Sequence, residues 1–78
     1  MFMQRELLDN LIVTARLMGY HTVVSDSDGI SVIKSSPQKR INLIYKSNKS
    51  KSHVLWSGKT ECFFDSKEEA LITFREWL

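Results

Sequence analysis

The sequence predicts a small α+β domain with the element order α-β-β-β-β-α. We expect an antiparallel sheet of four or five strands with both helices packed on one of its faces. Apolar residues recur with helical spacing at both ends of the chain, whereas the middle is rich in β-branched and aromatic residues separated by turn residues. The length of 78 residues suits a single domain, which would comprise residues 1–78.

The first helix is expected over residues 3–18, where Gly19 is well placed to end it. One apolar stripe would face the core, made by Leu7, Leu8, Leu11, Ala15 and Met18. A second apolar set, Phe2, Val13 and Leu17, falls on the opposite side of the helix. These three are either scattered surface hydrophobes, which are common, or a contact with a partner. The second interpretation predicts a homodimer.

Strands are expected over residues 20–25, 30–34, 40–46 and 53–57, and in the five-stranded alternative a short edge strand follows over residues 60–64. An Asp-Gly pair at positions 28 and 29 would supply the positive φ angles of a tight hairpin. Pro37 interrupts the pattern between the second and third strands because it cannot donate to a ladder.

The alternation of apolar and polar residues indicates which strand residues face the helices. We assign Ile41, Leu43 and Tyr45 to the covered face, together with Val54 and Trp56. This assignment leaves Ile44 and Leu55 on the open face, as candidate contacts for a partner or a second copy.

The second helix has the clearest start signal in the chain. Ser66 and Glu69 fit a capping box, in which the hydroxyl and the carboxylate satisfy free backbone N–H groups reciprocally. The residues that follow at helical spacing give one apolar face, made by Ala70, Leu71, Phe74, Trp77 and Leu78.

Charge is segregated along the chain although the net charge is only +2. Residues 29–60 carry seven cations and no carboxylate, whereas residues 1–28 carry two cations and four acids, and residues 61–78 carry two cations and five acids. Lysines interspersed with Ser and Asn are suited to contact phosphate oxygens. The candidate anion-binding residues are therefore Lys34, Lys39, Arg40, Lys46, Lys49, Lys51 and Lys59.

Catalytic and metal-binding patterns are not found in the sequence. His21, His53 and Cys62 are the residues that could act as a base or nucleophile near neutral pH, and they occur singly. Gly58-Lys59-Thr60 lacks the earlier glycine of a phosphate-binding loop. We therefore expect no enzyme, no metal, no cofactor and no small-molecule substrate.

A single cysteine excludes a disulfide within a monomer and fits a reducing compartment, so we expect a cytoplasmic protein. The longest apolar run falls far short of the ~20 residues needed to span a bilayer, so we expect no membrane association. The preferred function is a non-enzymatic binding module that docks an anionic partner through a basic strand–loop surface. Nucleic acid is the preferred partner, ahead of an acidic protein surface. The alternative is a protein–protein adaptor or inhibitor, such as an accessory protein of a mobile element. It would use the open sheet face or the outer side of the first helix.

Overall fold

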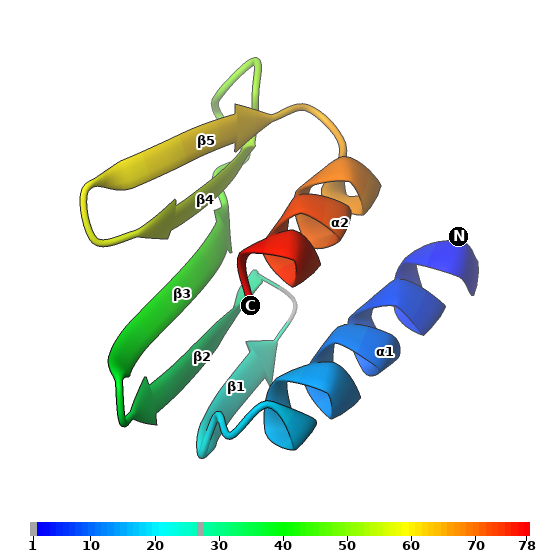
Figure 1. Ribbon diagram of the computed structural model, residues 1–78. Coiled ribbons are helices and arrows are strands. Elements are labelled where there is room, and N and C mark those ends of the chain that lie inside the picture. Colours follow the sequence, from blue (N-terminus) through cyan, green and yellow to red (C-terminus); the bar gives the residue numbers. More distant parts are fainter. Residues whose placement is uncertain (1, 27) are drawn as a thin grey trace.

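The computed structural model of the protein describes residues 2–26 and 28–78, and side chains from Arg5 onward. Its elements follow the chain as α1 (Phe2–Leu17), β1 (Thr22–Asp26), β2 (Gly29–Ser35), β3 (Gln38–Tyr45), β4 (His53–Ser57), β5 (Thr60–Phe64) and α2 (Lys67–Trp77). The strands form one antiparallel sheet in the order β1-β2-β3-β4-β5 (Figure 1). The predicted α+β class and element order are confirmed, and the sheet has five strands.

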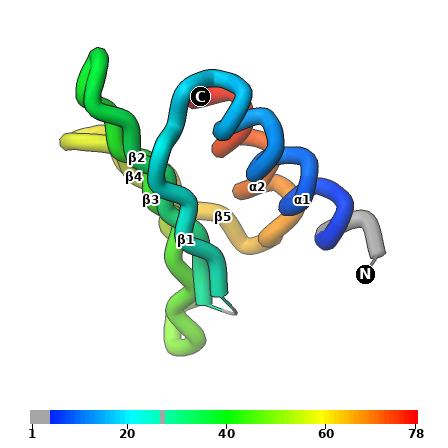
Figure 2. Tube along the Cα trace, turned by 90° about the horizontal axis from the view of Figure 1, so that it is seen from below, coloured from blue at the N-terminus to red at the C-terminus, as the bar shows by residue number. Residues whose placement is uncertain are grey.

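Both helices lie on the same side of the sheet and leave its other side uncovered (Figure 2). Neighbouring strands alternate in direction, so β1 and β5 run the same way. Each helix runs opposite to the strand that is next to it in the chain. The helices are consequently parallel neighbours, as Figure 1 shows. The side of the sheet away from the helices is called the open face below.

The helix boundaries follow the signals in the sequence. After α1, Gly19 has a φ of 94°, the left-handed conformation expected where a helix ends. Before α2, Ser66 is the N-cap, and its hydroxyl accepts a hydrogen bond from the backbone N–H of Glu69 at 3.4 Å. Acidic residues in the first turn of α2 favour the positive end of the helix dipole.

One hydrophobic core fills the space between the helices and the sheet. Side chains from α1, α2 and strands β2, β3 and β4 contribute to it, and its fully buried members include Leu11, Ala15, Val32, Ile41, Leu55, Ala70 and Phe74. Tyr20, in the link between α1 and β1, is also buried, and its hydroxyl donates to the Leu78 carbonyl at 3.4 Å. Burial of the phenol raises the pKa of Tyr20.

The orientation assigned to β4 from the sequence was wrong. Leu43 pairs with Leu55, so Leu55 shares the helix-covered face with Leu43 and is 0% exposed. Val54 and Trp56 face the opposite way, with Ile44, which pairs with Val54. The error arose because residues 54–56 are all apolar, and such a run does not reveal which positions face the core. Leu55 therefore cannot contact a partner on the open face.

The glycines of the first and last hairpins have different backbone conformations. Gly58 has a φ of 60° at the first central position of the β4–β5 turn, as a II′ hairpin requires. Gly29 does not have the positive φ expected from the Asp-Gly pair, and it pairs with Ile44 inside β2. The β1–β2 turn is instead held by Asp26, whose Oδ1 accepts from the backbone N–H groups of Asp28 and Gly29 at 2.8 and 3.0 Å.

Candidate nucleic-acid interface

Two of the seven predicted anion-binding residues lie on the helix side of the sheet and contact their own chain. The ammonium group of Lys34 lies 4.8 Å from the centroid of the Tyr20 ring, a cation–π contact. The ammonium group of Lys39 donates to the carbonyl of Trp77 at the end of α2, where it also favours the negative end of the helix dipole. Both side chains are half-buried, so they have structural roles on the helix side.

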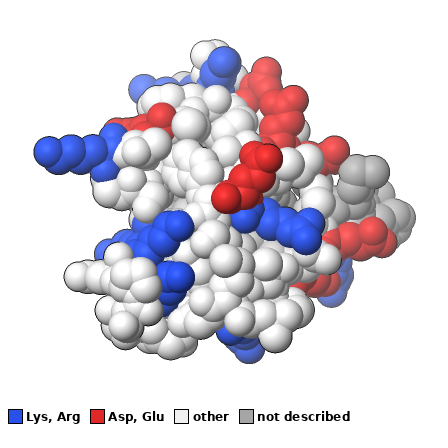
Figure 3. All heavy atoms as spheres, viewed as in Figure 1, with Lys and Arg blue, Asp and Glu red and all other residues white. Residues whose placement is uncertain are grey.

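The other five cations are exposed, and they divide between the two ends of the sheet. Arg40 in β3 and Lys59 in the β4–β5 turn lie at one end, whereas Lys46, Lys49 and Lys51 belong to the β3–β4 connection at the other. In the view of Figure 3, cations lie over the edge formed by the hairpins and at the top of the molecule, whereas carboxylates and further cations are interspersed over the helix side. The cations that are contiguous in sequence are therefore not one continuous cluster in space.

The open face between these two groups carries apolar side chains. Residues that pair across the strands form rows on this face. One row contains Val24, Ser31, Asn42, Trp56 and Glu61, and the next row contains Ile44, Val54 and Phe63. Phe63 is 53% exposed and Ile44 36%, whereas Val54 between them is only 5% exposed because its neighbours cover it. An uncovered apolar strip of this kind is a candidate contact surface.

Two aromatic residues and one arginine lie on a diagonal across this strip. Trp56 pairs with Glu61 and with Asn42; Phe63 is two residues beyond Glu61, and Arg40 is two residues before Asn42. Phe63, Trp56 and Arg40 are thus successive diagonal neighbours on β5, β4 and β3, at spacings of about 7–8 Å. Arg40 and Trp56 also line one shallow hollow of about 500 Å³.

Polar groups on the open face can form hydrogen bonds with a ligand. The Ser31 hydroxyl donates to Oδ1 of Asn42 at 2.7 Å, which fixes the orientation of the amide beside Trp56. The side-chain N–H groups of Asn42, in the same row as Trp56, can donate to a ligand. Glu61 is unfavourable for an anionic ligand, because its exposed carboxylate lies next to Trp56 on the same face.

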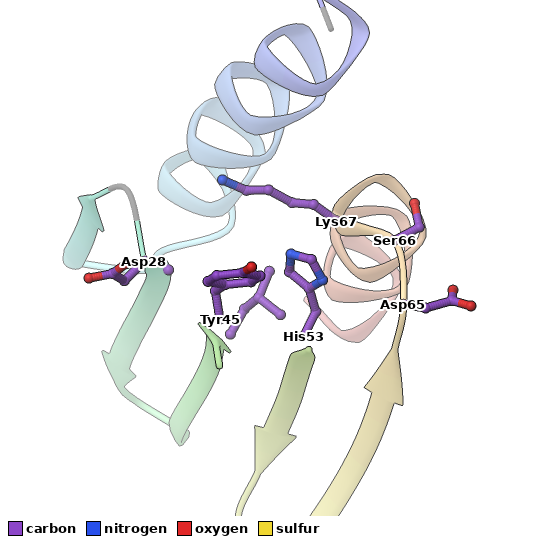
Figure 4. Close-up of a pocket in the computed structure, with 8 residues that line it drawn as sticks. Asp28, Tyr45, His53, Asp65, Ser66 and Lys67 are labelled. Atoms are coloured by element: carbon purple, nitrogen blue, oxygen red, sulfur yellow. The ribbon is translucent and has the colours of Figure 1, made fainter. Parts of the chain in front are cut away.

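A second hollow, of about 490 Å³, lies on the helix side at the N-terminal end of α2. The Tyr45 and His53 rings are neighbours there, with centroids 5.1 Å apart and planes tilted by 49°. Lys67 reaches over them from α2, while Asp65 points away (Figure 4). Partial burial, and then the positive charge of Lys67, lower the pKa of His53. This favours the neutral imidazole.

The other residues considered for chemistry lie apart from this hollow. His21 is exposed immediately before β1, where its backbone N–H donates to the Ile33 carbonyl. Cys62 is a half-buried free thiol in β5. Within residues 2–26 and 28–78, no group of three or more His, Cys, Asp or Glu side chains could hold a metal ion. Among the described helices, none is long and apolar enough to cross a membrane.

The predicted partner contact on α1 is partly described. Val13 and Leu17, one helical turn apart, are 57% and 83% exposed on the side of α1 away from the core. Phe2, which was grouped with them, has a side chain outside the described residues. The second apolar stripe of the helix indicated this contact in the sequence, and its two described members, Val13 and Leu17, are exposed.

Trp56 and Phe63 were not singled out from the sequence as site residues. Trp56 was assigned to the covered face, and Phe63 was regarded only as part of a short edge strand. Alternation along β5 indicates that Phe63 faces the opposite side of the sheet from its neighbours Cys62 and Phe64. Which side that is depends on the register with β4.

The fold and its surface define a class of protein rather than a family: a small meander sheet covered by two helices on one side, with the other side free. No protein-family model matches the chain, no curated protein matches it, and no solved structure matches it.

Proposed function

We propose that this protein is a non-enzymatic binding module that docks nucleic acid through the exposed cations of its strands and loops. The observation that carries the proposal is that five cations, from Arg40 to Lys59, are exposed at the two ends of a sheet face that no helix covers. An extended polyanion can contact both ends at once, whereas a small anion would meet only one of them. Phosphate contacts by Lys and Arg are the main source of affinity for nucleic acid.

The direct test is a gel shift with duplex and single-stranded oligonucleotides at two salt concentrations. If all five cations contact phosphates, the slope of log affinity against log salt should be about −4.5 for a duplex and about −3.5 for a single strand. No binding to any DNA or RNA at low ionic strength would remove the proposal.

A matched pair of variants separates a local effect from net charge. Reversing Lys46, Lys49 and Lys51 to Glu should abolish binding, since these residues belong to the exposed β3–β4 connection. The control reverses Arg5, Arg16 and Arg75, which are exposed on the helices; each triple variant changes the net charge by −6, from +2 to −4. Equal losses in both variants would mean that the cations act only through overall charge.

A second candidate function, a protein–protein adaptor or inhibitor, is favoured by the exposure of Val13 and Leu17 on α1. Two large apolar side chains on one surface of a helix can pack against a partner helix or a second copy. Light scattering on the wild type and on Leu17→Glu tests the homodimer, because a charged residue there should give a monomer. If the wild type is already monomeric, this surface would bind a different protein and not a second copy.

A further inference from the structure

We propose that the nucleic acid is single-stranded, and that its bases stack on Trp56 and Phe63 across the open face. This inference rests on the proposed function, since it names the form of nucleic acid and the side chains that read it. It assigns the central part of the binding surface to aromatic residues, between the two groups of cations.

The placement of the two rings suits successive bases. Trp56 on β4 and Phe63 on β5 are diagonal neighbours, and the register with buried Leu55 puts both on the side of the sheet opposite the helices. Every base has a flat π face, so stacking on aromatic side chains requires no particular sequence. Because the spacing of diagonal neighbours is wider than one stacking distance, the two rings would accept bases that have been separated from each other.

The surroundings favour an anion with planar groups over an apolar protein segment. Arg40 continues the diagonal beyond Trp56, where its guanidinium can meet a phosphate or stack on a base. Lys46, at the other end of β3 from Arg40, lines another hollow with Trp56, Ile44, Val54 and Glu61. Arg40 and Lys46 therefore provide cations on either side of the row that contains Trp56, and Glu61 is the carboxylate within that row.

A duplex fits this face poorly. Its bases are stacked and paired, so their π faces are closed to the rings of the open face, whereas a single strand can turn its bases toward the protein. Sheets that present aromatic side chains on an uncovered face are suited to single strands for this reason. The Asn42 amide, fixed by Ser31, can then contact a base edge beside Trp56.

The test is fluorescence anisotropy with a labelled ten-nucleotide oligothymidine and with a labelled duplex of the same length. Phe63→Ala and Trp56→Ala should each weaken binding of the single strand by about five- to 150-fold, the range for loss of one base–aromatic stack. Trp56→Phe should retain most of the affinity because it keeps an aromatic face. Ile72→Ala, which removes an exposed apolar side chain on α2, is the matched control and should bind as the wild type does.

Phe63→Leu distinguishes stacking from a general apolar contact, because it keeps apolar area and loses the aromatic face. This position is more than half exposed, so the variant should fold normally. Retention of wild-type affinity in Phe63→Leu, or tighter binding of the duplex, would overturn the stacking inference and leave the proposed function standing. No binding of any oligonucleotide at low salt would overturn both, and a dimer that Phe63→Ala dissociates would then assign the face to a second copy.

Discussion

Gly29 and Leu43 approach so closely across β2 and β3 that a Cβ at position 29 would lie 2.0 Å from the Leu43 carbonyl oxygen. The contact is with backbone, which cannot move aside without disturbing the ladder. Gly29→Ala should therefore destabilise the protein by about 1–3 kcal/mol or more, as overpacking does. Urea unfolding measures this. Ser25→Ala, at an exposed position of the neighbouring strand, is the control and should change stability by less than about 0.5 kcal/mol.

Leu55 and Ile44 provide a test of which face of β4 meets the helices. Leu55→Ala should cost about 2–5 kcal/mol because it opens a cavity in the core, and Ile44→Ala should cost much less because that side chain is already 36% exposed. Thermal unfolding of the two variants compares them. The reverse order of stability would restore the orientation first assigned from the sequence.

The sequence was sufficient to predict the helices and most of the strands. Gly19, the Ser66 cap and the apolar stripes are local signals, and local signals are what a single sequence contains. The orientation of β4 was not predictable in this way, since residues 54–56 offer apolar side chains to both faces and pairing with β3 decides between them.

The candidate site was predicted less well than the fold. Charge along the chain identified the cations, but the placement of Lys59 at the same end of the sheet as Arg40 depends on the β4–β5 hairpin and on the pairing of β4 with β3. Lys34 and Lys39 engage Tyr20 and Trp77, and these long-range contacts leave no trace in local sequence. The position of Trp56 on the open face was not predicted because it depends on the register of β4 with β3.

The lowered pKa of His53 predicts a dependence of stability on pH. The unfolded chain binds a proton at His53 more readily than the folded protein does, because burial and Lys67 disfavour the folded imidazolium. Stability should therefore rise with pH between the lowered folded pKa and the ordinary value of about 6.5, and then level off. Urea unfolding across this range should show the slope.

His53→Gln should remove this contribution, and the exposed His21→Gln should leave it in place. An unchanged slope in His53→Gln would show that another group titrates in this range.

Glu61 places a carboxylate beside Trp56 on the surface assigned to a polyanion. Glu61→Gln keeps the size of the side chain and removes the charge, so it should tighten oligonucleotide binding several-fold at low salt and less at high salt, where screening weakens the repulsion. The matched control is Glu76→Gln, exposed on α2. Anisotropy titrations compare them; equal effects, or weaker binding in Glu61→Gln, would place the ligand elsewhere.

The most direct measurement uses the two tryptophans as internal reporters. Trp56 lies on the open face, whereas Trp77 packs against the core at the end of α2. In a ¹H–¹⁵N NMR titration with single-stranded oligothymidine at low salt, the indole N–H signal of Trp56 should shift while that of Trp77 stays in place. A titration in which neither signal moves, or in which only Trp77 responds, would contradict nucleic-acid docking on this face.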